Sequence, residues 1–241
     1  MSDGPAPVAV ALTAVRRRLA QAARAAGREP SAIRLVAVSK TFPPDAVREA
    51  AIARQVDFGE NKVQEGLQKI AATRDLSLRW HLIGHLQANK SRRAAASFHA
   101  IHSIDSLDLL RRVDAAAADA GTSPEVFVQV DLAGELTKFG TPEPAVQALF
   151  EAPLRAARLV GLMLLPPWTD NPEDARSWFR RLRELRDGLA ARGIPPDRLR
   201  ELSMGMSHDF EVAVQEGSTL VRIGTAIFGT RAPHARQEAS G

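Results

Sequence analysis

"LVAVSKTFPP", residues 35–44, is an apolar run that ends in a lysine and is followed at once by residues that suit the start of a helix. The β-branched and aliphatic residues favour a strand. Pro43, Pro44 and Asp45 fit a first helical turn, where proline loses no hydrogen bond and an acid faces the positive end of the helix dipole. A strand that passes directly into a helix is the unit of a parallel sheet with crossover helices, so this stretch predicts an α/β fold.

Seven further apolar, β-rich runs repeat this unit along the chain, with helical segments between them. The eight runs are IRLVAVS (33–39), VDFGE (56–60), RWHLIG (79–84), AIHSI (100–104), EVFVQVD (125–131), RLVGLML (158–164), RELSM (200–204) and LVRIG (220–224). Eight parallel strands with short loops predict closure into a (β/α)8 TIM barrel. A doubly wound open sheet is the competing fold, but no strand here leads into a G-x-G-x-x-G turn.

The segments before and after the strands define the limits of the domain. Residues 8–26 predict an alanine-rich amphipathic helix before the first strand, which could plug or flank the bottom of the barrel. No linker rich in proline, glycine or serine divides the chain, so we expect one domain over 1–231 and a disordered tail over 232–241. No apolar run approaches the roughly 20 residues of a membrane span, and the first residues lack the features of a signal peptide. We therefore expect a cytoplasmic protein without membrane contact.

Composition excludes several chemistries. The chain has no cysteine, which rules out disulfides, thiol nucleophiles and thiolate metal sites. The net charge of +4 raises nucleic acid as a partner. The arginine clusters at 16–18 and 176–186 nevertheless lie at helical spacing among acids and alanines, which favours solvated helix faces over a phosphate-binding surface. We expect no nucleic-acid partner.

Lys40 lies where the first strand leaves the core. In a TIM barrel the C-terminal ends of the strands and the loops after them form the active face. Partial desolvation of a lysine there disfavours its charged form and exposes a neutral amine, which can form an imine with an aldehyde. The alternative is a lysine that buries its stem and extends its ammonium group into solvent.

The last two strand ends favour phosphate binding. Gly224 and Thr225 follow the final strand, where backbone N–H groups at the start of a short helix can bind an anion. The preceding strand end reads SMGMSHD (203–209), and Ser203 and Ser207 offer hydroxyl groups there; taken alone, this segment fits a capped turn equally well. Barrels frequently hold phosphate in the loops after strands 7 and 8, so the two segments together favour a phosphate site.

Two further residues complete a recognisable set. Arg222 lies two residues before Gly224, so its side chain is on the same face of the strand as that residue and can point toward the barrel mouth. An arginine that faces a pyridine nitrogen keeps that nitrogen unprotonated. Asn61, after the second strand, is either a neutral hydrogen-bonding group at the mouth or a helix cap. A lysine that forms an imine, a phosphate cradle and an arginine between them describe a site for pyridoxal phosphate.

A metal site is not indicated. His81 and His85 are four residues apart, but there is no H-E-x-x-H motif, His81 falls in a predicted strand, and no third ligand is evident. We expect no metal. His85 is predicted either to line the mouth or to lie in a solvated loop, and Lys138 lies near the mouth after the fifth strand without a role that the residues define.

The chain resembles a known family in the order and content of its motifs. The matching segments are AVSKTFP, FGENKVQE, WHLIGHLQANK, IHSIDS, KFG, GLMLLPP and LSMGMSHDFEVAVQEGSTLVRIGTAIFGTR. They resemble the pyridoxal phosphate homeostasis proteins, single-domain barrels that are similar to the N-terminal barrel of alanine racemases. The resemblance implies that Lys40 holds pyridoxal 5'-phosphate as an aldimine, that Arg222 lies beside the pyridine nitrogen, and that Ser207, Gly224 and Thr225 bind the phosphate. It implies further contacts from Ser203 and Asn61.

The resemblance also implies a function, namely buffering and delivery of the cofactor with little or no turnover. The partners would be the small-molecule cofactor and, transiently, apo enzymes that need it, and we expect a monomer. The alternative is a racemase-like enzyme, which needs an acid or base on each face of the substrate carbon. In the related racemases one of these is a tyrosine from a second domain. This chain has no tyrosine, so His85 or His208 would have to serve. An imine-forming aldolase that uses Lys40 is a third possibility.

Overall fold

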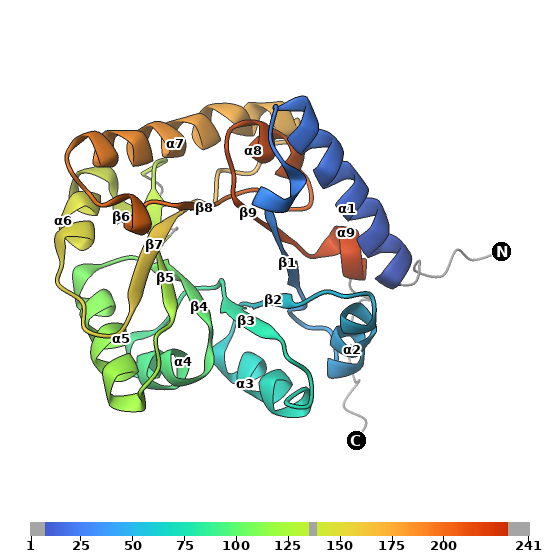
Figure 1. The fold of residues 1–241 in the computed structure, drawn as a ribbon, viewed down its shortest axis with the longest axis horizontal. Helices are drawn as coiled ribbons and strands as arrows, with labels where there is room; N and C mark the ends of the chain where they lie inside the picture. Colours follow the sequence, from blue (N-terminus) through green and yellow to red (C-terminus); the bar gives the residue numbers. More distant parts are fainter. Residues whose placement is uncertain (1–7, 135–138, 231–241) are drawn as a thin grey trace, which may run out of the picture.

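Eight parallel strands close into a barrel in the computed structural model, which describes residues 8–134 and 139–230 (Figure 1). Within those residues the strands follow the order β1-β2-β3-β4-β5-β7-β8-β9, and β9 pairs with β1 to close the ring. A two-residue strand, β6, pairs additionally with β5. The strands are β1 (Arg34–Val38), β2 (Asp57–Glu60), β3 (Arg79–Leu82), β4 (Ala100–Ile104), β5 (Glu125–Asp131), β6 (Thr141–Pro142), β7 (Arg158–Met163), β8 (Glu201–Ser203) and β9 (Leu220–Ile223). The predicted TIM barrel is confirmed.

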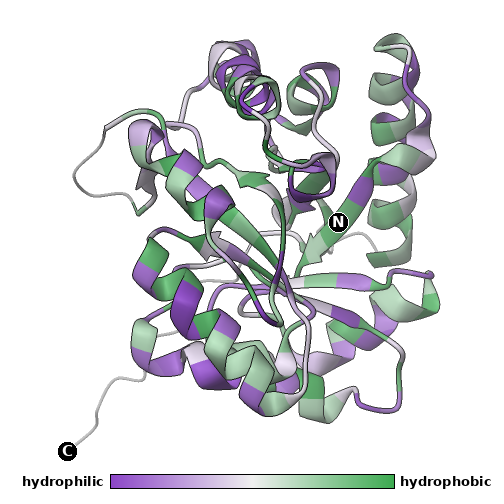
Figure 2. Cartoon of the chain, turned by 60° about the vertical axis from the view of Figure 1, so that its left-hand side comes forward, coloured by the Kyte–Doolittle hydropathy of each residue, from purple (hydrophilic) through white to green (hydrophobic). Residues whose placement is uncertain are grey.

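The helices lie outside the ring of strands and carry both hydrophilic and hydrophobic residues, as amphipathic helices do (Figure 2). They are α1 (Val8–Ala25), α2 (Pro44–Ile52), α3 (Val63–Ala72), α4 (Ser91–Ser97), α5 (Leu107–Ala120), α6 (Val146–Glu151), α7 (Arg176–Ala191), α8 (Phe210–Gln215) and α9 (Thr225–Phe228). Local signals set the bounds of α5: the Ser106 hydroxyl accepts the Leu109 N–H at 3.3 Å, and Gly121 ends the helix in the left-handed conformation.

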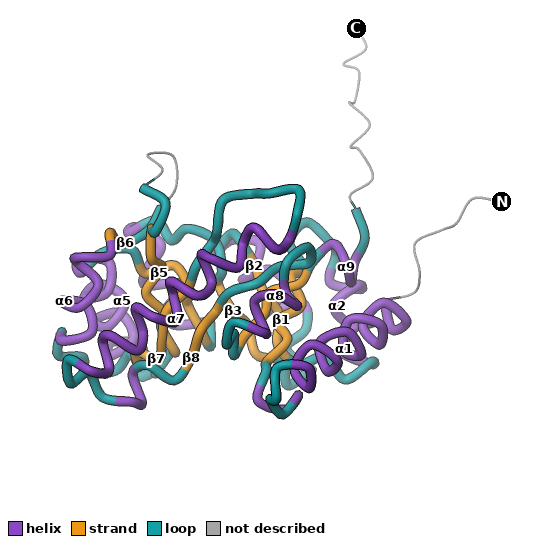
Figure 3. Tube along the Cα trace, turned by 90° about the horizontal axis from the view of Figure 1, so that it is seen from above, coloured by secondary structure: helices purple, strands orange, loops and turns teal. Residues whose placement is uncertain are grey.

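The N-terminal helix flanks the side of the barrel and does not plug its bottom. Helix α1 packs against α2, α8 and α9 and buries Leu12, Val15 and Leu19 (Figure 3). Helix α9 follows the last strand but has only four residues, so it leaves much of that sector of the ring uncovered. The apolar face of α1 therefore fills the place in the outer layer that a longer final helix would take.

The arginine cluster of α7 is less solvated than the sequence predicts. Arg176, Arg180 and Arg183 place nitrogen atoms 3.0, 3.3 and 2.9 Å from the carboxylate of Glu216, which is buried. Glu216 directly follows α8, so these ion pairs join α7 to the neighbouring element of the ring. Three of the arginines of this helix thus form ion pairs within the fold.

Some sequence predictions fall outside the described residues. These are the disordered tail at 232–241 and the position of Lys138; the single domain predicted over 1–231 also extends beyond the described ranges. Across residues 8–134 and 139–230, no helix combines the length and the apolar character that crossing a membrane requires.

Candidate functional site

A cavity of about 740 Å³ opens at the C-terminal ends of the strands. Its lining comes from the C-terminal parts of β1, β5 and β9, from the segments after β1, β2, β3, β5, β7, β8 and β9, and from Trp178 of α7. The predicted site residues that line it are Lys40, Asn61, Ser207, Arg222, Gly224 and Thr225. Residues from both ends of the sequence therefore converge on one cavity, as the closed parallel barrel requires.

Lys40 follows the end of β1 by two residues and is exposed at the cavity, so the partial desolvation expected from the sequence is absent. The backbone on either side of it is fixed by α3. Lys69 Nζ donates to the Ser39 carbonyl at 2.6 Å, and the Glu65 carboxylate accepts the Thr41 N–H. Thr41 has a φ of 70°, in the left-handed region that β-branched residues rarely adopt. A constrained backbone thus carries an exposed lysine side chain.

Lys69 is the centre of a largely buried charged cluster that contacts the backbone on either side of Lys40. We call Ser39, Glu60, Glu65 and Lys69 the Lys69 cluster. Lys69 Nζ lies 2.7 Å from Glu60 Oε1 and 2.9 Å from Glu65 Oε1, and the Ser39 hydroxyl donates to Glu60 Oε1 at 2.6 Å. Burial raises the pKa of Glu60, although hydrogen bonds from Lys69 and Ser39 oppose the shift. Sequence analysis missed this cluster; its only local signal was the Glu65–Lys69 spacing of one helical turn.

The two predicted phosphate-binding segments are joined by hydrogen bonds. The Ser207 hydroxyl, in the loop after β8, accepts the N–H groups of Gly224 at 3.2 Å and Ala226 at 3.3 Å. A Cβ atom on Gly224 would lie 3.2 Å from the Val38 carbonyl oxygen, so the backbones approach closely here. Thr225 is exposed at the cavity lining. The result is a small cradle of hydroxyl and N–H groups.

Arg222 lies at the floor of the cavity and is buried. Its guanidinium donates from Nη1 to the Ser203 hydroxyl and from Nη2 to the Leu164 carbonyl at 2.9 Å. Burial lowers the pKa of Arg222 to about 10, while the nearby Asp209 acts in the opposite direction, so the group is a cation at neutral pH. Ser203 is absent from the cavity lining and lies beneath it, where it contacts Arg222.

Two histidine–aromatic pairs stand at the rim. The ring of His85 stacks on Phe139 at a centroid distance of 3.6 Å, and its Nδ1 lies 3.3 Å from an Asp105 oxygen. The ring of His208 lies 4.8 Å from that of Trp168, which is largely exposed. His85 thus lies at the mouth, one of the two positions considered for it. Phe139 and Trp168 carried no sequence signal beyond being apolar residues in loops.

Asn61 and the two spaced histidines occupy different surroundings. Asn61 is half-buried at the cavity lining, and the Gly84 backbone packs directly against it. His81 lies in the barrel interior, where it bonds Asp57 and His102, so it does not converge with His85. Among the residues that the structure describes, no three histidine or acidic side chains gather as a metal site would require.

Comparison with known proteins identifies the family. The family model described as alanine racemase, N-terminal domain, matches residues 10–232. The pyridoxal phosphate homeostasis protein of Aquifex aeolicus is 43% identical over 225 residues, which are 91% of this chain and 96% of that protein. This chain belongs to the pyridoxal phosphate homeostasis protein family. The member from Pseudomonas aeruginosa is 45% identical over 227 residues, 93% of this chain and 96% of that protein.

Solved structures agree with this membership. PipY of Synechococcus elongatus, solved with pyridoxal phosphate bound, is 40% identical, has a TM-score of 0.78, and matches 89% of this chain and 100% of its own. Alanine racemase from Streptomyces coelicolor has a TM-score of 0.64 at 21% identity and matches 92% of this chain but 59% of its own. At that identity the likeness to the racemase concerns the barrel fold alone.

Proposed function

We propose that this member of the pyridoxal phosphate homeostasis family binds pyridoxal 5'-phosphate in the 740 Å³ cavity and holds it through Lys40. The observation that carries the proposal is that one cavity gathers an exposed amine, a hydroxyl and N–H cradle, and a buried guanidinium. Its volume lies within the range of about 300–1,000 Å³ that small-ligand sites occupy. The relative PipY, solved with this ligand, supports the choice.

The donor set fits the three functional groups of the ligand. When the neutral amine of Lys40 adds to the aldehyde carbon, water leaves and an imine bond joins ligand and protein. We assign the phosphate to Ser207, Gly224 and Thr225, because their hydroxyl and N–H groups form the cradle. We assign the pyridine nitrogen to Arg222, since a cation there disfavours protonation of that nitrogen.

Asn61 and Ser203 take different parts in this assignment. Asn61 reaches the cavity lining and supplies a neutral hydrogen-bonding group to the ligand. Ser203 lies beneath the lining, so we assign it to Arg222 and not to the ligand itself.

We propose that the cellular role is to buffer and deliver the cofactor, with little or no turnover, as a cytoplasmic monomer that contacts apo enzymes transiently. The names of the relatives support homeostasis as the role. The absence of tyrosine from the sequence removes the second base that the related racemases use. Light scattering of the purified protein tests the monomer, and transfer of bound ligand to an apo aminotransferase tests delivery.

A racemase-like activity is the second candidate, because His85 and His208 line the same cavity as Lys40. If either histidine is a second base, deuterium from the solvent should enter the α-carbon of an added amino acid. Sustained exchange that is lost in Lys40→Ala would replace the homeostasis role with catalysis.

The test of binding is the visible absorption spectrum of protein incubated with pyridoxal phosphate, followed by borohydride reduction and peptide mapping. We expect the label on Lys40. Lys40→Ala should lose the reducible adduct but keep phosphate-dependent binding, because the cradle remains. Lys62→Ala is the matched control, since Lys62 is exposed and lies outside the cavity lining.

Two outcomes would contradict the assignment. A label on Lys138 in the native protein would move the imine to another lysine. A protein that forms no adduct at all would favour the aldolase alternative, in which Lys40 reacts with a substrate carbonyl.

A further inference from the structure

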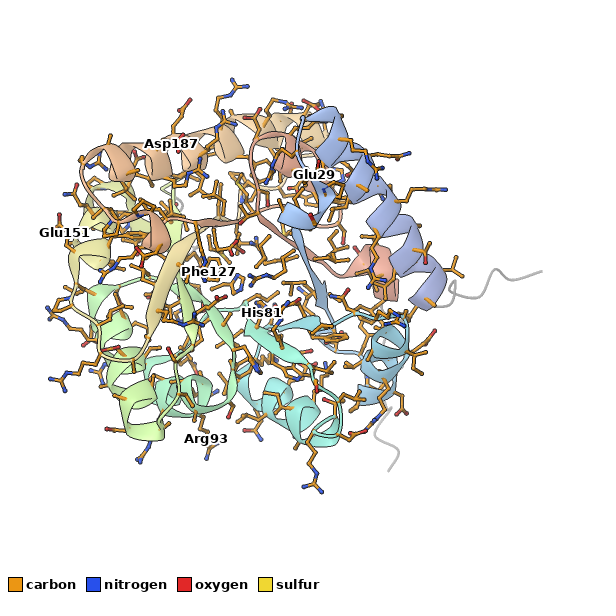
Figure 4. The ribbon with its side chains drawn as sticks, in the orientation of Figure 1. Glu29, His81, Arg93, Phe127, Glu151 and Asp187 are labelled. Carbon is orange, nitrogen blue, oxygen red and sulfur yellow. The ribbon has the colours of Figure 1, made fainter. Side chains whose placement is uncertain are left out.

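The barrel interior holds a line of buried polar side chains where branched apolar residues usually dominate. Asp57, His81, His102, Ser203 and Arg222 come from β2, β3, β4, β8 and β9, and each is at most 5% exposed. Figure 4 labels His81 and Phe127, which belong to different strands of the ring. We call these five residues the axial chain.

Consecutive members of the axial chain are within hydrogen-bond distance. Arg222 Nη1 lies 2.5 Å from Ser203 Oγ, and that oxygen lies 2.8 Å from His102 Nδ1. His102 Nε2 lies 3.0 Å from His81 Nδ1, and His81 Nε2 lies 2.9 Å from Asp57 Oδ1. The chain starts at the floor of the candidate site and ends at the first residue of β2, at the opposite end of the barrel.

The far end of the axial chain is anchored at a second opening. Asp57 Oδ2 accepts a hydrogen bond of 2.7 Å from Arg79, whose side chain is half-exposed. Arg79 and His81 both line a cavity of about 340 Å³ among the N-terminal ends of the strands. Burial acts to raise the pKa of Asp57, but hydrogen bonds from His81 and Arg79 outweigh it and hold that pKa below its usual value.

The hydrogen positions follow from the donors and acceptors. An ionised Asp57 only accepts, so His81 Nε2 carries a hydrogen. Complete burial lowers the pKa of His102 well below its usual value, so the ring is neutral and carries one N–H. If His102 Nε2 donates to His81, its Nδ1 is free to accept the Ser203 hydroxyl hydrogen, and the Ser203 oxygen then accepts from Arg222.

The opposite arrangement satisfies fewer groups. If His102 Nδ1 carried the hydrogen, Ser203 would accept from both His102 and Arg222. Its own hydrogen would then have no acceptor among the hydrogen bonds of the described residues. An unsatisfied buried donor is costly, so every hydrogen bond of the axial chain runs in one direction, from Arg222 toward Asp57.

We propose that His102 is a positioning residue: by binding the Ser203 hydrogen it directs a Ser203 lone pair at Arg222, and so orients the guanidinium at the floor of the ligand site. The ring of Phe127 stacks on His102 at 4.2 Å and fixes its plane. The expected effect of His102 on ligand binding rests on the proposed function, whereas the hydrogen bonds of the axial chain do not depend on it.

The first experiment reads the axial chain in protein without ligand. In protein whose histidines are labelled with nitrogen-15, the chemical shifts of the ring nitrogens distinguish the two neutral tautomers and the cation. We expect the Nε2–H form for both His81 and His102. Ser203→Ala should shift the Nδ1 signal of His102 by removing its donor, and Asp57→Asn should shift the signals of His81. A Nδ1–H tautomer at His102 would overturn the proposal.

The second experiment compares two replacements by pyridoxal phosphate titration. His102→Phe removes both hydrogen bonds and keeps a ring, whereas His102→Asn keeps an acceptor for Ser203 and loses only the bond to His81. We expect about tenfold weaker binding and a displaced absorption maximum for His102→Phe, and near-native behaviour for His102→Asn.

The control is His99→Gln. His99 lines the same cavity as Arg79 and His81, among the N-terminal ends of the strands, but it does not belong to the axial chain. This variant should leave affinity and spectrum unchanged. Native affinity and an unshifted spectrum in folded His102→Phe would refute the positioning role. If the native protein bound no pyridoxal phosphate, the proposed function would fail, while the nitrogen-15 experiment would still decide whether the axial chain exists as described.

Discussion

Replacement of Lys69 by methionine should leave the buried carboxylate of Glu60 without its positively charged partner. Lys69 and Glu60 are 3% and 0% exposed, and the Lys69 ammonium supplies a hydrogen bond to Glu60 of 2.7 Å. It also binds Glu65 and the Ser39 carbonyl. Methionine is unbranched and of similar length, so the variant removes the charge with little change in packing.

The expected loss of stability follows from the burial of the pair. Removing one partner of a buried ion pair costs about 3–5 kcal/mol, because the other charge is left uncompensated. For a chain of this size that is a fall in Tm of about 6–20 °C. Glu65 is partly exposed and should add little.

The loss should depend on pH. Burial raises the pKa of Glu60 in the folded protein above its ordinary value of 4.5. Protonation of Glu60 therefore stabilises the folded state. This stabilisation is fully present below pH 4.5 and is lost as the pH rises through the folded pKa. Without Lys69 the hydrogen bond and the charge that oppose this shift disappear, and the folded pKa of Glu60 rises further. The deficit of Lys69→Met should therefore be larger at pH 8 than at pH 5.

Urea unfolding at both pH values, followed by circular dichroism, measures the deficit. Glu60→Gln and the double variant complete a mutant cycle, in which the double variant should be more stable than Lys69→Met at pH 8. Lys62→Met is the control and should stay within about 0.5 kcal/mol of the native protein, since Lys62 is exposed. A deficit for Lys69→Met below about 1 kcal/mol, or one that is equal at the two pH values, would refute the reasoning.

Three further predictions concern other parts of the barrel. Burial, together with the positive charges of Arg222 and Arg34, lowers the pKa of His102 well below 6.5. The contribution of His102 to stability is therefore present above pH 6.5 and falls by about 1.4 kcal/mol per pH unit as the solution becomes more acidic. His102→Phe should remove that part of the slope in urea titrations between pH 4.5 and 7. The Asp114 carboxylate accepts three consecutive backbone N–H groups before β7 at 2.9–3.0 Å, so Asp114→Ala should cost about 2–4 kcal/mol in thermal unfolding, and an unchanged Tm would contradict this. A Cβ on Gly84 would lie 2.8 Å from the Asn61 Cα, so Gly84→Ala should displace Asn61 and weaken pyridoxal phosphate binding about tenfold. Native affinity in this variant would show that Asn61 does not contact the ligand.

The barrel could be predicted because its signals are local. Each strand is a short β-rich run, and the helix that follows starts and stops on residues such as Ser106 and Gly121. The place of α1 could not be predicted in the same way. Its amphipathic face shows that it packs against something, but its partners α8 and α9 lie near the other end of the described chain.

For the candidate site, the residues near strand ends could be predicted from the sequence, but the groups that support them could not. Lys40, Ser207 and Gly224 lie in the segments just after strand ends, and the geometry of a parallel barrel brings such residues together. The supporting groups were not predictable, because Lys69 and His102 depend on which side chains meet between different elements. A polar residue in the middle of an apolar strand, such as His102 in AIHSI, is the signal that could have indicated an interior network.

The packing of α1 has a consequence for synthesis on the ribosome. The helix is made early, yet α8, α9 and strand β9, the partner of β1, are among the last described elements to be made. Until about residue 228 has emerged, Leu12, Val15 and Leu19 lack these partners and remain available to chaperones. We therefore expect the barrel to close late, with the final strand completing the ring and the first helix docking in the same step.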